Sequence, residues 1–483
     1  MIRFSRIAIL SLTLVCAPLA AQPSARALED AFHAALPGAR IGLVVTTMDG
    51  DELISIAPEV RFIPGSNTKM LTTAAAFANI GDLTLPDQSG GASVRLAQDR
   101  PGAPDVVLTG HGDARLSSDP ACVVDCLTTL ADAVAAKTKS VHDVIGDDSF
   151  FPDQRWSPGM SWNNIPTRSG TGISALTIDD NELVVTVTPA ALGKPPTLAL
   201  LPYFEIDNRA VTVASGKTDL DFDRLPFSRT IRLVGTIAID AAPAQVRLGI
   251  DDPADFAAWR LKTLLAERGV KVTGTVSARH RVLQRFDDPA ERAGAPAPRV
   301  PEPEALAHLV PPPLADDLTV TNKVSQNLHA ELLLRRVGRV TGTGSIADGV
   351  AAVEAVMTAA GVPRTGWDIS DGSGMSSYNR LSPRGQAKLL RWIAAQSWGA
   401  AWRTTLPIAG IDGTLGRRFR ESALQGKLFA KTGTLNASAG LSGYMIAASG
   451  KTLIFSIFAN DVPSDASASP AIDATLLAVA AAN

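Results

Sequence analysis

Cysteine and histidine are scarce in this chain, and their scarcity excludes a class of site. Three cysteines and six histidines occur among 483 residues. The histidines are scattered, with neither an H-E-x-x-H pattern nor a paired-cysteine spacing: His33, His111, His142, His280, His308 and His329. Zinc sites in proteins show such spacings. We therefore expect no catalytic metal and no other cofactor.

An excess of charge is also lacking. The 45 basic residues face 48 acidic ones, for a formal net charge of -3. Nucleic acids and anionic membranes are held by strongly cationic surfaces, so we expect no nucleic-acid partner. No apolar run reaches the roughly 20 residues that span a bilayer, which argues against a transmembrane anchor. A content of 46% hydrophobic residues instead indicates a folded chain, long enough for more than one core.

The first 21 residues have the pattern of a secretory signal peptide. Arg3 and Arg6 precede an apolar run over 7–19, and the small residues Ala20 and Ala21 follow it. We expect cleavage near Ala21 and export of the mature protein to the periplasm.

Only two cysteines remain after that cleavage. Cys122 and Cys126 are four residues apart, which suits a disulfide that closes a short loop in an oxidising compartment. Two separate thiols on one helical face would have the same spacing. The sequence leaves both alternatives open.

Strand patterns lie at both ends of the chain. Residues 41–48 and 53–56 are β-rich and flank the turn residues Asp49-Gly50-Asp51, which predicts a hairpin. Residues 67–79 have an apolar helical pattern. Three further β-rich runs, 428–434, 440–447 and 452–460, come before a final helix over 472–480. Because one hairpin cannot form a whole sheet, we expect both ends to pair in one antiparallel sheet.

The middle of the chain has the composition of separate domain material. It contains β-rich runs at 183–187, 210–213 and 231–239, a helical pattern over 253–268, and a proline-rich connection over 287–313. We therefore expect residues 22–81 and 300–483 to form one discontinuous domain. Residues 82–299 are expected to be an insertion, with a smaller domain nested at about 180–250.

Three short motifs that carry chemistry occur in order: Ser66-Asn67-Thr68-Lys69, Ser325-Gln326-Asn327 and Lys431-Thr432-Gly433-Thr434. A single Ser-x-x-Lys occurs by chance about once in a chain of this length, as a helix cap beside a solvated lysine. Here Ser66 follows Pro64-Gly65 at the expected start of a helix, where the helix dipole favours developing negative charge. Lys69 lies one turn later on the same face.

The other two motifs also have ordinary structural explanations. Ser325 can be the N-cap of a helix running to Leu334, with Asn327 in its entry turn. Lys431 can face solvent on an edge strand, in which Gly433 is a weak position. In a functional strand, that glycine would let a ligand backbone come close. Chance is a poor explanation for all three motifs in this order and context.

Together the motifs resemble those of the penicillin-recognising serine enzymes. The chain is most similar to the D-alanyl-D-alanine carboxypeptidases and endopeptidases of the low-molecular-mass class C penicillin-binding proteins, which carry inserted domains between the first two motifs. Further stretches resemble that family: Pro312-Pro313-Leu314, Ala330-Glu331, Asp371-Gly372-Ser373-Gly374, residues 409–415, Asp147 of an Asp-x-Ser-x-Phe stretch, Trp156 and Trp162-Asn163. One position departs from the family pattern, because Ser377 stands where an arginine is usual.

The resemblance implies a mixed α/β (α+β) fold of the penicillin-binding-protein and β-lactamase type, with an antiparallel sheet flanked by helices and β-rich inserted domains. It implies catalysis by Ser66, Lys69 and Ser325. The resemblance implies substrate binding by five further residues, Asn327, Lys431, Thr432, Gly433 and Thr434, and by Asp147.

In that reading, Ser66 attacks the bond between two terminal D-alanines of a peptidoglycan stem peptide, and Lys69 takes its proton. Burial and the charge of Lys431 are both expected to keep Lys69 neutral. β-Lactams are expected to acylate Ser66 as inhibitors. The alternatives are a serine β-lactamase or esterase on the same scaffold, and a wall-binding or sensing protein without turnover.

Overall fold

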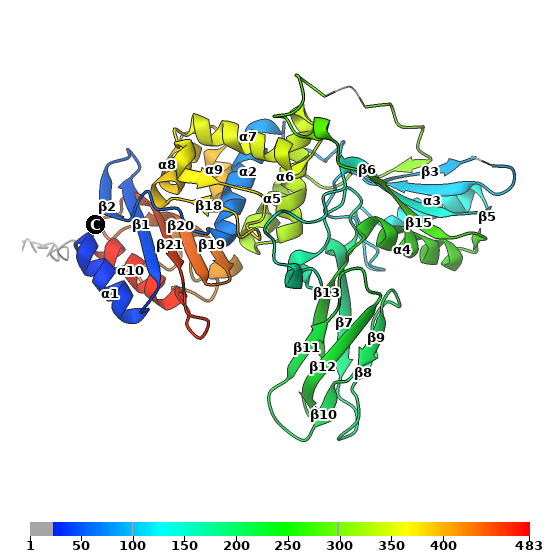
Figure 1. Cartoon of the computed structure of the whole chain (residues 1–483), viewed down its shortest axis with the longest axis horizontal. Helices are drawn as coiled ribbons and strands as arrows, with labels where there is room; N and C mark the ends of the chain where they lie inside the picture. The colour runs from blue at the N-terminus through cyan, green and yellow to red at the C-terminus, as the bar shows by residue number, and fades with distance from the viewer. Residues whose placement is uncertain (1–22, 99, 297–298) are drawn as a thin grey trace, which may run out of the picture.

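The computed structural model describes residues 23–98, 100–296 and 299–483. The expected signal peptide lies outside these residues. Two parts lie side by side, one built from both ends of the chain and one from its middle (Figure 1). Within the described residues, no helix has the length and apolar composition needed to cross a membrane.

The first part contains one large sheet with helices on both faces. Its strands are β1 (Arg40–Thr47), β2 (Glu52–Ile56), β19 (Leu428–Leu435), β20 (Ser438–Ile446) and β21 (Thr452–Asn460). Its main helices are α1 (Ala25–Ala35), α2 (Thr68–Asn79), α5 (Leu314–Lys323), α6 (Asn327–Thr341), α7 (Ile346–Ala359), α8 (Pro383–Ala394), α9 (Gly399–Thr404) and α10 (Ser469–Ala482). A two-stranded ribbon joins β17 (Trp367–Asp368) to β18 (Arg380–Leu381).

The strand order β19-β20-β21-β1-β2 joins the two ends of the chain. β1 pairs with β21 along its whole length, in antiparallel orientation, with Ile41 opposite Ala459. This pairing confirms the expected sheet. The strand order also makes β19 an edge strand, so one of its sides pairs with no other strand of this sheet.

Alternation along β21 explains why both faces of this sheet are covered. Leu453, Phe455 and Ile457 point into the core shared with α1 and α10, whereas Ile454 and Phe458 point into the core beneath α2 and α8. Side chains two residues apart share a face of a strand, so this run of apolar residues needs a layer of helices on each side. α2 is thereby packed against the sheet near its edge strand.

The second part has its own core around a mixed sheet with the order β15-β6-β4-β3-β16. These strands are β3 (Ser93–Ala97), β4 (Asp105–Thr109), β6 (Val144–Pro152), β15 (Val276–Arg281) and β16 (Ala307–His308). Helices α3 (Leu127–Lys137) and α4 (Pro253–Glu267) belong to the same core, and α4 matches the helix expected at 253–268. Two short strands, β5 (Ser140–Val141) and β14 (Lys271–Val272), pair beside it.

Residues 182–249 form two small sheets that project from the second part (Figure 1). One has the order β13-β7-β8 and the other contains β10-β12-β11, with β9 paired to β12. The strands are β7 (Glu182–Thr188), β8 (Thr197–Ala199), β9 (Glu205–Asn208), β10 (Val211–Val213), β11 (Asp219–Asp223), β12 (Thr230–Ala238) and β13 (Ala244–Gly249). The division into domains at 82–299 and 180–250 remains our interpretation of these sheets.

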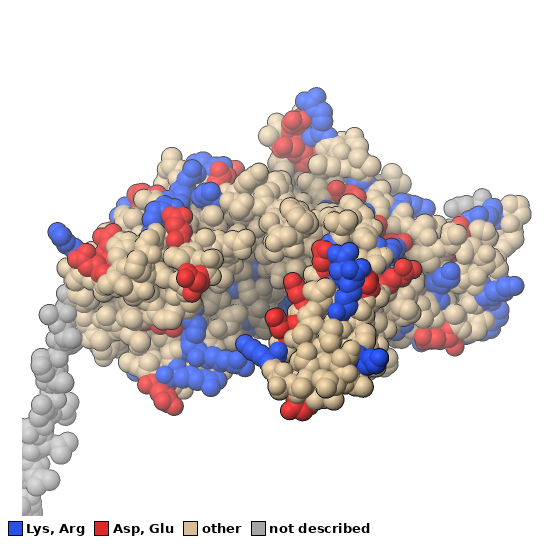
Figure 2. All heavy atoms as spheres, turned by 60° about the horizontal axis from the view of Figure 1, so that its bottom comes forward, with Lys and Arg blue, Asp and Glu red and all other residues tan. Residues whose placement is uncertain are grey.

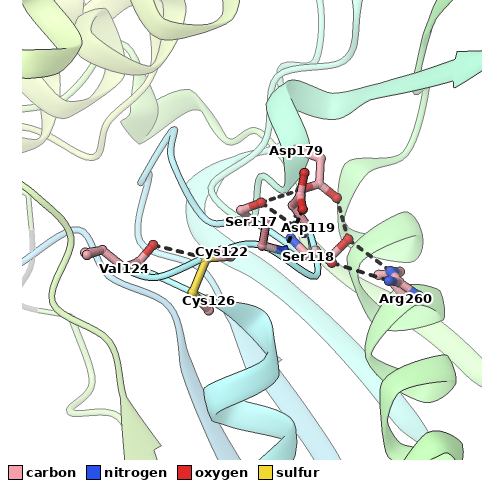
Figure 3. The surroundings of a disulfide bond; sticks show 9 residues. Ser117, Ser118, Asp119, Cys122, Val124, Cys126, Asp179 and Arg260 are labelled. Carbon is pink, nitrogen blue, oxygen red and sulfur yellow. Dashed lines mark hydrogen bonds between the residues drawn. A yellow bond between two sulfur atoms is a disulfide. The ribbon is translucent and has the colours of Figure 1, made fainter.

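Cys122 and Cys126 form a disulfide just before α3 (Figure 3). Beside it, the carboxylate of Asp179 accepts hydrogen bonds from Ser117 and Ser118, and Arg260 donates to the Ser118 hydroxyl at 2.9 Å. The disulfide thus closes a short loop that is held to α4 and to the chain around residue 179. Of the two alternatives, the structure contains the disulfide.

The disulfide loop holds one acidic residue against another. Asp125 lies between the cysteines with a φ of 60°, and its two buried carboxylate oxygens have no hydrogen-bond partner within the described residues. Burial, and then the neighbouring Asp125, raise the pKa of Asp113 well above its usual range. Folding therefore opposes the ionisation of Asp113.

We expect Asp113→Asn to stabilise the protein at neutral pH. The pKa of Asp113 is raised in the folded protein, so the protonated carboxyl group contributes to the stability of the fold. This contribution is lost progressively as pH rises above the unfolded pKa near 4. Asparagine removes that loss and still accepts the hydrogen bond from the Arg115 N–H. Thermal unfolding at pH 8 should show a gain on the order of 1 kcal/mol that shrinks toward pH 4. The exposed Asp49→Asn is the control, and an equal change there would contradict the assignment.

Candidate active site

Ser66 and Lys69 form the first contact of the site. Ser66 lies in the 3-10 turn η1 (Gly65–Asn67), which leads directly into α2, and Lys69 lies in the first turn of that helix. Lys69 Nζ lies 2.9 Å from Ser66 Oγ. Lys69 is fully buried, whereas Ser66 is partly exposed. A substrate can therefore reach the hydroxyl but not the amine.

The Lys69 amine is also held from two other directions. It donates to Asn327 Oδ1 at 2.7 Å and to the Ser373 carbonyl at 2.6 Å. Asn327 is the first residue of α6, and Ser373 belongs to the Asp371-Gly372-Ser373-Gly374 stretch. Lys69 therefore connects its own motif, which begins at Ser66, with the motif that ends at Asn327.

Ser325 lies in the turn between α5 and α6, and not at the N-cap of α6. Gln326 is the N-cap, and α6 extends to Thr341, beyond the expected end at Leu334. Ser325 has a φ of 64°, a left-handed conformation that is uncommon for residues other than glycine. Lys431 Nζ donates to Ser325 Oγ at 2.9 Å. Two serine–lysine pairs thus lie in one site.

Edge strand β19 supplies the third motif. The Ala430 N–H points away from β20 and donates to the Pro407 carbonyl. Because backbone groups alternate sides along a strand, the N–H groups of Thr432 and Thr434 face the same open side. The Thr432 hydroxyl is hydrogen-bonded to that of Thr414 at 2.8 Å.

Gly433 is required for packing within the protein itself. A Cβ at this position would lie 2.3 Å from the Pro64 carbonyl and 2.6 Å from the Asn67 amide. The missing side chain thus lets β19 lie against the turn that presents Ser66. This reason differs from the expected approach of a ligand backbone, so we regard Gly433 as a positioning residue.

Burial governs the charge of the two lysines. It lowers the pKa of Lys69 to about 7, although the carboxylates of Asp371 and Glu331 raise it. Burial, and then the charge of Lys69, lower the pKa of Lys431 well below its usual range. Burial alone accounts for the lowered pKa of Lys69, so the additional role expected for the charge of Lys431 stays a prediction.

Two buried carboxylates hold the loop that faces Lys69, and we assigned them no role from the sequence. Glu331 on α6 accepts hydrogen bonds from the N–H groups of Gly372 and Ser373 at 3.0 and 2.9 Å. Asp371 accepts from the N–H groups of Gly374 and Ser376. Burial, and then the charge of Glu331, raise the pKa of Asp371 to about 6. The signal that could have identified these two residues is the resemblance of Ala330-Glu331 and of Asp371-Gly372-Ser373-Gly374 to the family pattern.

The insertion forms one wall of the site. Asn327 Nδ2 donates to the Ser169 carbonyl at 2.9 Å, so the amide that holds Lys69 is itself fixed by the second part of the molecule. A small cavity of about 20 Å³ next to Asn327 is lined from both parts, by Thr171 of the insertion and by Met375 among others. In the space-filling view, the surface is hollowed between the two parts (Figure 2).

Asp147 and Ser377, which were noted in the sequence, take no part in the hydrogen bonds that join the three motifs. Asp147 is in β6, pairs with Arg279 at 3.0 Å and accepts from the Ser149 N–H, so its described contacts stay within the insertion. Ser377, at the position where the family has an arginine, donates from its hydroxyl to the Gly159 carbonyl at 2.9 Å. We therefore leave Asp147 out of the candidate site.

One group of side chains has the composition of a metal site. Asp105, His142 and Asp143 can bring one ligand atom each within 4.8 Å of one another. However, the Arg100 guanidinium already pairs with both carboxylates, at 2.9 and 2.8 Å. A cation would have to displace it, so we assign no metal to this group.

Comparisons with known proteins identify the family of this chain. The D-Ala-D-Ala carboxypeptidase 3 (S13) family model matches residues 25–483. A D-alanyl-D-alanine carboxypeptidase of Actinomadura sp. (strain R39) is 34% identical over 448 residues, which cover 88% of this chain and 78% of the relative. The D-alanyl-D-alanine carboxypeptidase DacB of Haemophilus influenzae is 24% identical, over 88% of this chain and 86% of the relative.

Solved structures show the same fold. The crystal structure of penicillin-binding protein 4 (dacB) from H. influenzae matches with a TM-score of 0.76 at 20% identity, over 94% of this chain and 97% of the other. These matches confirm the mixed α/β fold and the resemblance on which it was expected. With the family model covering nearly the whole described chain, this protein belongs to the D-Ala-D-Ala carboxypeptidase 3 (S13) family of serine peptidases.

Proposed function

We propose that this protein is a serine-type D-Ala-D-Ala carboxypeptidase that forms an acyl-enzyme on Ser66. The observation that carries the proposal is the contact of the partly exposed Ser66 hydroxyl with a buried lysine whose pKa is about 7. An ordinary lysine, with a pKa near 10.4, is almost wholly protonated at neutral pH and accepts no proton. A lysine with a pKa near 7 is a general base at neutral pH.

The first half-reaction begins with attack of Ser66 Oγ on the carbonyl carbon between two terminal D-alanines. Lys69 takes the hydroxyl proton as the Oγ–C bond forms. The N–H groups of Ser66 and Thr434 would stabilise the negative charge on the carbonyl oxygen, and the Thr434 N–H faces the open side of β19. Collapse of this intermediate breaks the C–N bond and needs a proton on the leaving amine.

Ser325 would relay to the leaving amine the proton that Lys69 took from Ser66, so that Lys69 is neutral again for the second step. The Ser325 hydroxyl contacts Lys431, and Asn327, two residues later, contacts Lys69. Lys431, Thr432 and Thr434 would bind the terminal carboxylate, whose negative charge favours the ammonium form of Lys431. Water then hydrolyses the ester on Ser66 and releases the shortened peptide. A β-lactam would acylate Ser66 by the same attack and remain as an inhibitor.

The proposed substrates are the stem peptides of peptidoglycan, in keeping with the names of the bacterial relatives. The proposed location is the periplasm, which rests on the signal-peptide pattern of the first 21 residues. D,D-endopeptidase activity on cross-links uses the same chemistry, since both reactions break a bond after D-alanine. A β-lactamase or esterase on this scaffold would instead turn over nitrocefin rapidly. A non-catalytic wall-binding protein would bind such peptides without cleaving them.

Mass analysis of peptidoglycan fragments tests the proposal. A purified disaccharide pentapeptide should lose one D-alanine, and cross-linked dimers should be cleaved to monomers if endopeptidase activity is present. Ser66→Ala should leave both unchanged. Intact pentapeptide together with fast nitrocefin hydrolysis by the wild-type protein would replace the proposal with the β-lactamase alternative.

A further inference from the structure

A second pocket, of about 550 Å³, is lined by residues near the ends of β6 and β15 and by residues at the C-terminal end of α6. Four arginines and two phenylalanines dominate its lining: Arg281, Arg292, Arg299, Arg339, Phe150 and Phe286. No acidic side chain is among the described residues that line it. The volume falls within the range of small-molecule sites.

This pocket is separate from the active site. Asn327 begins α6 and Arg339 lies in its last turn. At 1.5 Å per residue, the two positions are roughly 18 Å apart along the helix. A ligand here would not compete with one at Ser66.

Two of the four arginines are neutralised by carboxylates behind the pocket wall. Arg281 forms a bidentate pair with the fully buried Asp287, at 2.9 and 3.0 Å. Arg292 pairs with Asp348 at 2.6 Å. These ion pairs explain the positions of both side chains without any ligand.

The other two arginines carry charge that the protein does not neutralise fully. The Nη1 group of Arg299 is buried without a hydrogen-bond partner within the described residues. Its Nη2 lies 3.3 Å from Glu302, a carboxylate that is shared with His111. Arg339 donates to the Gly342 carbonyl at 3.0 Å. Burial, and then the charges of Arg299 and Arg281, lower the pKa of Arg339.

Apolar surface lies next to these two guanidinium groups. Both stack on the ring of Phe150, with Cζ at 4.9 Å for Arg299 and 5.3 Å for Arg339. Phe286 is 51% exposed and lines the same pocket. Guanidinium groups fixed over an aromatic ring recognise planar oxyanions well, because less side-chain freedom is lost on binding.

We propose that this pocket binds an organic carboxylate on an apolar body, with Arg299 and Arg339 holding the carboxylate and the two phenylalanines contacting the body. A free phosphate would use the guanidinium groups but not the apolar wall. The site itself is independent of the active-site chemistry, and the proposal does not rest on the proposed function.

Titration calorimetry with three probes tests this proposal. Hippurate is a small carboxylate with an aromatic ring, N-acetylmuramyl-L-alanyl-D-isoglutamine is a wall fragment without a D-alanyl-D-alanine end, and inorganic phosphate is an anion without an apolar body. The variant is Arg299→Gln/Arg339→Gln. The control is Arg285→Gln, an arginine that is 90% exposed on the same segment and pairs with Glu291. Lys431→Ala reports any binding of a carboxylate at the active site.

We expect hippurate to bind the wild-type protein, more weakly at high salt, and to lose at least about tenfold in affinity in the double variant. Arg285→Gln and Lys431→Ala should bind hippurate as the wild type does. Muramyl-peptide binding as tight as that of hippurate would overturn the role of the apolar wall. Phosphate binding equal to that of hippurate, or an unchanged double variant, would overturn the site. These binding measurements do not depend on the peptidase assay. A negative result in one experiment therefore does not decide the other proposal.

Discussion

Replacing Lys69 with alanine should slow acylation of Ser66 by on the order of 10³-fold. The lysine amine is the group within 2.9 Å of Ser66 Oγ, and general-base catalysis typically supplies 10² to 10⁴. The rate of reaction with a chromogenic β-lactam measures this step. Lys69→Arg is the matched variant, because it keeps a cation but has no basic form at neutral pH. A rate in Lys69→Arg within tenfold of wild type would contradict the role as base.

The pH dependence of the wild-type reaction follows from the same residue. A pKa of about 7 for Lys69 means that the neutral, reactive form increases as pH rises through 7. The second-order rate of acylation should therefore rise from pH 5 to 8 and then level off. This rise should be absent in Lys69→Ala. Thermal unfolding of each variant separates a lost base from a lost fold.

Lys431→Ala should reduce acylation by about 10² to 10³ at every pH, with little change in the position of the profile. The loss reflects the missing partner for the substrate carboxylate and for Ser325. The profile should stay in place, since burial is the cause that lowers the pKa of Lys69.

The control for this variant is Lys427→Ala, an exposed lysine just before β19. It should behave as the wild type does. A shift of the Lys431→Ala profile by more than about one pH unit toward alkaline pH would show that the Lys431 charge does act on Lys69.

Much of the sheet could be predicted because its signals are local or follow from the pattern of side chains. The hairpin over 41–56 and the strands over 428–460 have β-rich composition and turn residues between them. Their pairing follows from the need to complete a sheet, and β1 does pair with β21. Helices α3, α5 and α7 were not predicted, since tertiary packing and not their own periodicity marks their limits.

For the candidate site, the motifs gave the residue types but not the geometry. That Ser66 contacts Lys69 follows from their spacing on one helix turn. That Asn327 contacts Lys69 while Ser325 contacts Lys431 depends on a left-handed serine between two helices, which no local pattern marks. The lowered pKa of Lys431 likewise comes first from burial, which is a property of the fold and not of the sequence.

Intact-mass spectrometry after incubation with benzylpenicillin tests the central claim most directly, because the claim is one covalent bond to one atom. The wild-type protein should gain a single adduct of the mass of the antibiotic, at pH 8 faster than at pH 5. Ser66→Ala should gain none, and its melting temperature should show that it is folded. An adduct of the same mass on folded Ser66→Ala protein would contradict the assignment of Ser66 as the nucleophile.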